Sequence, residues 1–574
     1  MSHTDFDAIV VGSGITGGWA AKELCERGLK VLVLERGRMV EHGRDYPTEH
    51  LPPWKIPSRN LADRPLYDSD YPIQQRARGF DFTTLHFWNN DRLNPYQQAP
   101  GKPYNWFRAD VVGGKSLMWG RHSYRWSDLD FEANRRDGHG CDWPIRYRDI
   151  RDWYSHVERF IGVSGEPLGL DHLPDGEFQP PMELNVVEKA FKRTVETTYP
   201  GRHVTIGRVA NLTRPIGDRA ACHYCGPCQR GCSAGAYFST QSSTLPAARR
   251  TGNLTLRPDS VVESLEYDEK SGRVVAVRVV DANTRARQRF TARLVFLCAS
   301  AYASLQVLLN STSRSFPQGI ANRSGTLGRY VMDHVHGQGA VAVMPGFDAK
   351  YYFGNRPNTF YLPRFRNLGR PNLDRQEPGV DFLRGYGYQG MAFPMEWNTT
   401  WASTPGFGAD FKRALRKPGH WLMFMIGFAE CLPYEDNRVV LARETDRFGI
   451  PQLRFELTYR DNEARAGHDM WAQAVEMMKA AGGVDVQPLD KPFTPGTSIH
   501  EFGGARMGAD PHASVLNAHN QAHDVPNLFV TDGACMSSTS CVNPSLTYMA
   551  LTARAAEYAA AQLKAGTLGA RPPA

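Results

Sequence analysis

The sequence lacks an uninterrupted apolar run of membrane-spanning length. Its longest uncharged stretch, residues 294–313, contains Ser, Gln and Asn, and we expect it to form a strand, a turn and a helix. No C-x-x-C-H motif occurs, which excludes a covalently attached c-type haem on this chain. We therefore predict no membrane span and no haem of its own.

The N-terminal residues also lack the features of an export signal. They read MSHTDFDAIVVG, with acidic residues where a secretory signal carries Lys or Arg, and no twin Arg follows. From its own sequence we expect the chain to be cytoplasmic.

Neither sign of charge is in large excess. Lys and Arg number 67 against 60 Asp and Glu, giving a net charge of +7, and the basic residues are spread along the chain. A nucleic-acid-binding protein instead gathers its basic residues into a patch. We therefore predict no nucleic-acid partner.

The sequence does contain the composition of a large globular protein with many loops. Apolar residues make up 41% and aromatic residues 11% of the 574 positions, with 53 Gly and 38 Pro. A chain of this length buries a sizeable core without a disulfide framework. Four of its ten cysteines nevertheless fall within the short run from Cys222 to Cys232.

The first forty residues predict a dinucleotide-binding β-α-β unit. Residues 7–11 form an apolar strand, a helix is expected through Arg27, and residues 30–34 form a second strand that ends at Glu35. The turn between the first strand and the helix carries the G-x-G-x-x-G glycines Gly12, Gly14 and Gly17. These allow, in order, a tight turn, close approach to a pyrophosphate, and close helix–strand packing. Glu35 can accept hydrogen bonds from ribose hydroxyls, which favours an adenosine without a 2′-phosphate.

Further blocks lie along the chain. Gly113 and Gly114, followed by Ser116, allow the backbone to approach a flat or anionic ligand. The others are Asp333-His334, residues 437–439 (NRV), residues 500–508 (HEFGGARMG) and residues 543–547 (NPSLT). In this order and over nearly the whole chain, the blocks resemble those of the glucose–methanol–choline (GMC) oxidoreductases, in the branch of sugar and glucoside dehydrogenases and pyranose oxidases. The residues that extend the N-terminal fingerprint (Ala21, Leu24, Gly28, Val31 and Gly37) are likewise similar to FAD-containing oxidoreductases.

The resemblance implies a mixed α/β fold of two interleaved parts. A Rossmann-like FAD-binding domain would span 1–336, with a Cys-rich insertion at 220–236, and an antiparallel-sheet substrate domain would span 337–491. Residues 492–564 would return to the FAD domain with the catalytic residues, and 565–574 would form a flexible tail.

The resemblance also implies site residues. The catalytic pair falls on His500 and Asn543, and Val261 and Asp532 join Asn543 at the cofactor. Neutral His is the side chain able to act as a base near neutral pH, and an amide can orient the same hydroxyl oxygen. Pyranose-oxidase relatives bond FAD covalently through a His in a Ser-x-His-Trp segment, where this chain has Met118. We therefore expect non-covalent FAD.

The cysteine run has the spacing C-x2-C-x2-C-x3-C, which is typical of ferredoxin-type iron–sulfur ligation. Similar sugar dehydrogenases hold a [3Fe–4S] cluster in this region, and their pattern corresponds to Cys222, Cys228 and Cys232, with Cys225 as an additional candidate ligand. Two disulfides, a zinc site and free thiols are the alternatives. The six other cysteines are interpreted as buried apolar residues.

Together these features predict an FAD-dependent dehydrogenase. It would oxidise a secondary CH–OH of a sugar or glycoside to a ketone, as in a 3-keto sugar, and pass electrons through the cluster to a partner such as cytochrome c. One alternative is a pyranose-oxidase-like enzyme that uses O2, with the cysteines in structural disulfides. Another is an electron-transfer flavoprotein without substrate chemistry, against which the presence of both His500 and Asn543 argues. Export with a small signal-bearing subunit would make the protein periplasmic.

Overall fold

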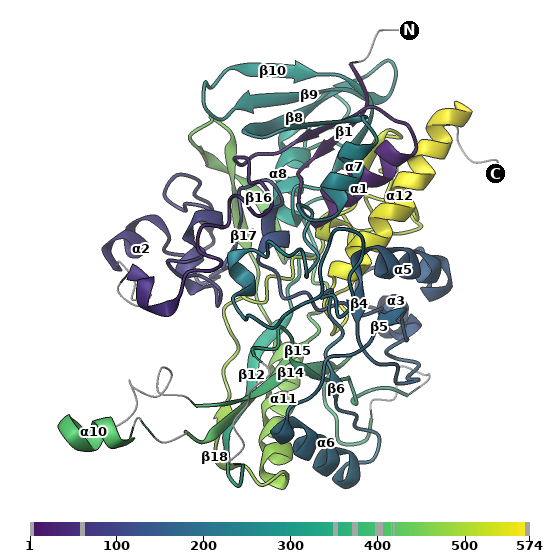
Figure 1. Cartoon of the computed structure of the whole chain (residues 1–574). Helices are drawn as coiled ribbons and strands as arrows, with labels where there is room; N and C mark the ends of the chain where they lie inside the picture. Colours follow the sequence, from purple (N-terminus) through teal and green to yellow (C-terminus); the bar gives the residue numbers. More distant parts are fainter. Residues whose placement is uncertain are drawn as a thin grey trace.

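The computed structural model describes residues 5–57, 64–347, 354–369, 377–395, 406–414, 416 and 419–568. Two layered halves lie one above the other in Figure 1, a parallel sheet with its helices above and an antiparallel sheet with its helices below. The predicted mixed α/β fold is confirmed.

A five-stranded parallel sheet forms the centre of the upper half, in the order β19-β11-β1-β2-β7. Its strands are β1 (Phe6–Val11), β2 (Val31–Leu34), β7 (Leu254–Arg257), β11 (Ala292–Leu297) and β19 (Leu528–Val530). The helices beside it are α1 (Ile15–Glu26), α7 (Thr244–Arg250) and α12 (Ser545–Ala565), and α1 packs against both others. Every residue of β2 is buried, as expected of a parallel strand covered on both faces.

The predicted β-α-β unit is confirmed in β1, α1 and β2. The uncharged stretch 294–313 likewise forms the end of β11, a turn and α8 (Ala301–Asn310). An antiparallel meander of β8 (Ser260–Asp268), β9 (Arg273–Asp281) and β10 (Arg287–Phe290) packs on α8 through β8.

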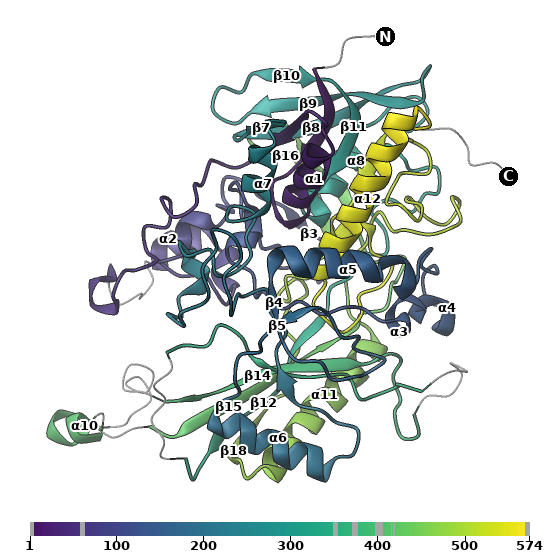
Figure 2. The same cartoon turned by 45° about the vertical axis from the view of Figure 1, so that its right-hand side comes forward.

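A six-stranded antiparallel sheet forms the lower half, in the order β18-β12-β15-β14-β13-β6. Its strands are β6 (Thr205–Ile206), β12 (Val335–Met344), β13 (Phe360–Leu362), β14 (Tyr386–Pro394), β15 (Trp421–Ala429) and β18 (Val484–Leu489). The helices α6 (Val186–Thr198) and α11 (Asp461–Ala480) lie against it (Figure 2). Tyr388 of β14 donates to the Met470 carbonyl oxygen on α11, and its neighbour Gln389 points to the opposite face, toward the upper half.

The two halves exchange segments. Although β6 and α6 precede residue 336, they pack with the lower sheet. Conversely β16 (Arg438–Thr445) and β17 (Pro451–Glu456) join β3 (Gln97–Gln98), and Tyr104 stacks on Phe455 in the upper core. The predicted domain boundaries at residues 336 and 491 therefore stay a prediction. The packing shows that each half also contains segments from the other side of these boundaries.

The remaining elements are short or peripheral. They are α2 (Arg64–Asp70), α3 (Asp128–Phe131), α4 (Ala133–Asp137), α5 (Tyr147–Ile161), β4 (Val163–Ser164), β5 (Phe178–Gln179) and α10 (Gly408–Ala414). The predicted tail starts inside α12, Leu568 is still buried, and 569–574 lie outside the described residues. No helix in the described part of the chain is long and apolar enough to span a bilayer.

Candidate active site

A cavity of about 410 Å³ lies between the two halves. The upper half contributes the β1–α1 turn, Glu35, residues 108–122 and the start of β8, and the lower half contributes Gln389 and Phe428. The returning C-terminal part contributes residues 498–501, 532–533 and 543–548. Segments far apart in the sequence therefore form one site.

The glycines of the β1–α1 turn take the positions predicted for them. A Cβ on Gly17 would lie 1.9 Å from the Gly12 carbonyl oxygen, so only glycine lets the helix begin so close to the strand. A Cβ on Gly14 would meet nothing within 4 Å, and Gly14 lines the cavity. The turn thus presents bare backbone at a helix N-terminus, as a pyrophosphate requires.

The second glycine segment faces the first. A Cβ on Gly114 would lie 3.5 Å from the Gly14 Cα, so the two glycine backbones border the same part of the cavity. The Gly113 amide donates to the Ser13 hydroxyl at 2.9 Å, which ties the two segments together. Ser116 donates to the Gly113 carbonyl oxygen, so its hydroxyl closes this turn.

Glu35 lies at the end of β2, where an adenosine ribose is expected. Its carboxylate accepts hydrogen bonds from the Ser13 amide and hydroxyl and from the Gly37 amide. Burial raises the pKa of Glu35 to about 7, against those hydrogen bonds, which lower it. Together with the two bare glycine segments, this acid makes a cradle that fits a dinucleotide.

The other two predicted cofactor residues also line the cavity. Val261 is buried at the start of β8. Asp532 accepts from the Ser304 hydroxyl at 2.5 Å and from the Ala534 amide, and burial raises its pKa to about 7. Met118 borders the cavity and has no imidazole nitrogen through which to bond FAD, so non-covalent binding stays the prediction.

His500 and Asn543 meet in this cavity. Asn543 Nδ2 lies 3.2 Å from His500 Nε2, and Gln389 donates to Asn543 Oδ1 at 2.6 Å. Burial, and then the neighbouring His334, His336, His122 and Lys115, lower the pKa of His500 well below its usual range. The structure therefore places a neutral imidazole and an amide side by side, as expected of the predicted catalytic pair.

Sequence reasoning did not assign several side chains of this site. The Lys115 ammonium pairs with Glu501, which also accepts from the Ser300 hydroxyl. His334 contacts the His500 ring, although Asp333-His334 was singled out only as a motif. Gln389 gave no signal, because its place opposite Asn543 depends on the position of β14 in the sheet.

The four clustered cysteines lie in the loop around the short 3-10 helix Cys228–Arg230. All ten cysteines lie among the described residues, and none forms a disulfide. No three His, Cys, Asp or Glu side chains of the described residues are grouped to hold a metal ion. Burial raises the pKa of Cys222 to about 11 and also raises those of Cys225 and Cys232. As placed, these residues do not fit an iron–sulfur cluster.

The fold and this cavity define a flavoprotein oxidoreductase that acts on alcohols. Profiles of the GMC oxidoreductase N- and C-terminal regions match residues 6–336 and 433–552, and the chain belongs to the GMC oxidoreductase family. Membership implies FAD as the cofactor and oxidation of CH–OH groups as the chemistry.

The relatives are oxidoreductases. The chain is 28% identical to 2-methyl-1,2-propanediol dehydrogenase of Mycolicibacterium austroafricanum, over 96% of this chain and 94% of the relative. It is 26% identical to the fructose dehydrogenase large subunit of Gluconobacter japonicus, over 98% of each chain. The crystal structure of pyridoxine 4-oxidase from Mesorbium loti shares the fold, with a TM-score of 0.57, 17% identity, and coverage of 96% and 98%.

Proposed function

We propose that the protein oxidises a secondary CH–OH of a sugar or glycoside to a ketone, such as a 3-keto sugar. The observation that carries this proposal is the contact between neutral His500 and Asn543 in a cavity that also contains the dinucleotide cradle. A sugar hydroxyl is a weak acid, so its oxidation needs a positioned base. The similarity to the fructose dehydrogenase large subunit supports a sugar as the substrate.

FAD, when bound, supplies the acceptor for the hydride that leaves the carbon. His500 Nε2, the ring nitrogen that faces Asn543, takes the hydroxyl proton. Asn543 Nδ2 hydrogen-bonds the same oxygen and holds the carbon–hydrogen bond in line. At the cavity wall the Lys115 ammonium pairs with the Glu501 carboxylate, so this carboxylate is not left without a cation near the base.

We further propose that the electrons pass to a protein partner or a dye in preference to O2. The propanediol and fructose relatives named above are both dehydrogenases, which supports this, and the free thiols give no support to the oxidase alternative with structural disulfides. Tyr237, which follows the cysteine run, donates to the carbonyl oxygen of Leu117, between the cavity-lining residues Ser116 and Met118.

The [3Fe–4S] cluster stays a hypothesis that the spacing alone supports. Iron analysis of anaerobically purified protein tests it, and absence of iron contradicts it. We also propose that the chain is exported together with a small signal-bearing subunit and that a cytochrome c accepts its electrons. Fractionation of the native cells and co-purification test both, and a cytoplasmic chain without partners contradicts them.

The catalytic proposal is tested by anaerobic stopped-flow mixing of the holoenzyme with sugars, glycosides and small diols. We expect a sugar or glycoside to bleach the flavin, and His500→Ala to slow bleaching about 10²- to 10⁴-fold while FAD stays bound. His519→Ala is the matched control, because His519 stacks on Tyr558 away from the cavity. Undiminished bleaching in His500→Ala, or bleaching by no alcohol at all, contradicts the proposal.

A further inference from the structure

A second histidine ring, His334, lies directly behind His500. It precedes β12 and is fully buried. Its Nε2 lies 2.8 Å from the Ser540 carbonyl oxygen and 3.2 Å from the Thr539 carbonyl oxygen. Carbonyl oxygens only accept hydrogen bonds. The hydrogen of this contact therefore belongs to His334 Nε2.

The other ring nitrogen of His334, Nδ1, must then be unprotonated. Burial lowers the pKa of His334 to about 4, so the ring is neutral near pH 7 and carries one hydrogen. His334 Nδ1 lies 2.8 Å from His500 Nδ1. Since His334 Nδ1 can only accept in this contact, the hydrogen belongs to His500 Nδ1.

The protonation of His500 Nδ1 determines which nitrogen of this ring can accept a proton in the cavity. His500 is also neutral, so a hydrogen on Nδ1 leaves Nε2 with a free lone pair. Nε2 faces the Asn543 amide nitrogen, a donor, at 3.2 Å. The Asn543 orientation agrees, since its oxygen accepts from Gln389. The contacts therefore form one series, from the Thr539 and Ser540 carbonyl oxygens through His334, His500 and Asn543 to Gln389. Each contact in it has one donor and one acceptor.

We propose that His334 is a positioning residue that fixes the tautomer of His500, with Nδ1 protonated and Nε2 free to accept the substrate proton. The link to catalysis rests on the proposed function, whereas the tautomer itself does not. Without His334, a neutral His500 is free to hold its hydrogen on Nε2, where it cannot serve as a base.

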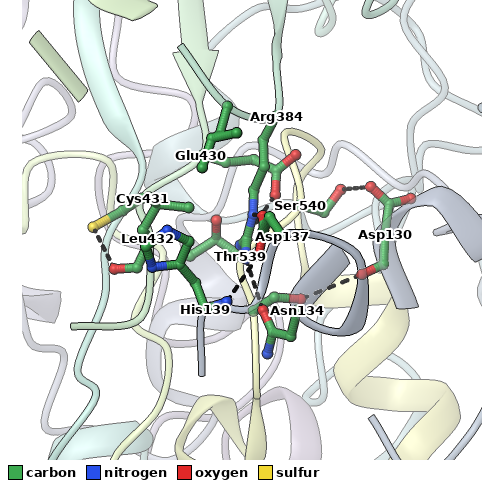
Figure 3. A network of polar contacts seen from close by, with 12 residues as sticks. Asp130, Asn134, Asp137, His139, Arg384, Glu430, Cys431, Leu432, Thr539 and Ser540 are labelled. Atoms are coloured by element: carbon green, nitrogen blue, oxygen red, sulfur yellow. Dashed lines mark hydrogen bonds and ion pairs between the residues drawn. The ribbon is translucent and has the colours of Figure 1, made fainter. Parts of the chain in front are cut away.

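The surrounding structure holds both rings in place. Ser540 adopts a left-handed backbone with φ of +54°, and its hydroxyl donates to Asp130 at 2.7 Å (Figure 3). Asp333 accepts from the Gly496 amide and the Ser498 hydroxyl, and Ser498 accepts from the His500 amide. The carbonyl oxygens that orient His334 and the backbone that carries His500 are therefore both fixed by hydrogen bonds.

The tautomer is measured directly by nitrogen-15 NMR of histidine-labelled holoenzyme, with His500→Ala used to assign the signal. We expect a protonated Nδ1 and a bare Nε2 on His500 in the wild type. His334→Gln keeps an acceptor oxygen and a donor amide, so we expect it to retain this pattern. His334→Phe keeps the ring volume without an acceptor, so we expect the His500 hydrogen to redistribute between the two nitrogens.

Anaerobic flavin reduction gives the second readout. We expect His334→Phe to slow the reduction roughly 10²-fold at unchanged FAD content, and His334→Gln to recover most of the rate. A wild-type His500 with its hydrogen on Nε2 overturns the proposal, even where His334→Phe fails to fold. So does a His334→Phe enzyme with the wild-type tautomer and rate. If no sugar reduces the flavin but the expected tautomer is found, the proposed function fails and the tautomer inference stands.

Discussion

The groups around the His500 ring all disfavour its protonation. His334, His336 and His122 are themselves buried, with pKa values lowered to about 4, 4 and 3, and Lys115 is a cation. In contact with the ring are another neutral ring and an amide, not a carboxylate. The imidazolium formed during turnover therefore has no direct counter-ion, and it releases its proton readily.

This environment predicts the pH dependence of the flavin reduction rate. The base must be neutral, and the pKa of His500 is lowered below the ordinary value of 6.5, so activity is retained above that lowered pKa and lost as the pH falls through it. We expect a flat rate from about pH 6.5 to pH 8 and an acid limb below 6.5. Single-turnover rates across this range test the expectation, and an acid limb at or above pH 6.5 contradicts it.

The sequence predicted the site residues that lie in local motifs. It missed the site residues that reach the cavity only through the tertiary fold. His500 and Asn543 lie 43 positions apart in two recognisable blocks, and the structure brings them together. Gln389 reaches Asn543 from 154 positions away, across the interface of the two halves. No local pattern marks a side chain of this kind, because its role arises from strand placement alone.

Among the elements, the β1–α1 turn separates structural from cofactor-facing glycines. Gly17 lies against the Gly12 carbonyl oxygen, and Gly14 lies against open cavity. The two positions are only one helical turn apart, so the same substitution tests two different functions of the turn.

We expect Gly17→Ala and Gly14→Ala to have distinct effects. The added methyl group of Gly17→Ala would overlap the strand backbone, so the thermal unfolding temperature of the apoprotein should fall. Gly14→Ala should leave that temperature unchanged but weaken FAD binding, because its methyl group occupies the cradle. Calorimetry of the apoproteins and titration with FAD measure the two effects. Equal destabilisation of both apoproteins contradicts this division.

The elements also show how far local sequence signals extend. The boundaries of β1, α1 and β2 were predicted to within a residue or two, because glycine spacing and apolar periodicity are local. The six-stranded sheet was expected only from the family resemblance. Its order depends on long-range pairing, as in Phe360 of β13 beside Ile206 of β6, and no periodicity encodes such a partner.

Across the whole molecule, a buried arginine connects the two halves. Arg384 donates to Asp137 at 2.8 Å and to Asn134 at 2.8 Å on α4, and it lies 3.6 Å from Glu430 after β15 (Figure 3). The side chains of Arg384, Asp137 and Glu430 are 3%, 6% and 1% exposed. Asn134 in turn donates to the Ser537 carbonyl oxygen, in the segment that leads to Ser540.

We expect Arg384→Met to lower the free energy of unfolding by about 3–5 kcal/mol, because it leaves the buried Asp137 carboxylate without its cation. Arg151→Met is the matched control, since the Arg151–Asp152 pair is exposed at 58% and 82%, and we expect no measurable change there. Urea unfolding of both variants measures the difference. Equal midpoints in the two variants contradict the proposed role of the connection.

The parallel sheet is completed by a strand that lies far along the chain from the strands it joins. β1 begins at Phe6, but its sheet gains the outer strand β19 only at Leu528, and α12 covers α1 later still. Until these segments emerge, the edge of β11 lacks its partner strand and α1 is packed by α7 but not by α12. Asp532 and Asn543 emerge at the same late stage. The cavity is therefore complete only after these residues have emerged, and products stalled before Leu528 would display an open strand edge to chaperones and proteases.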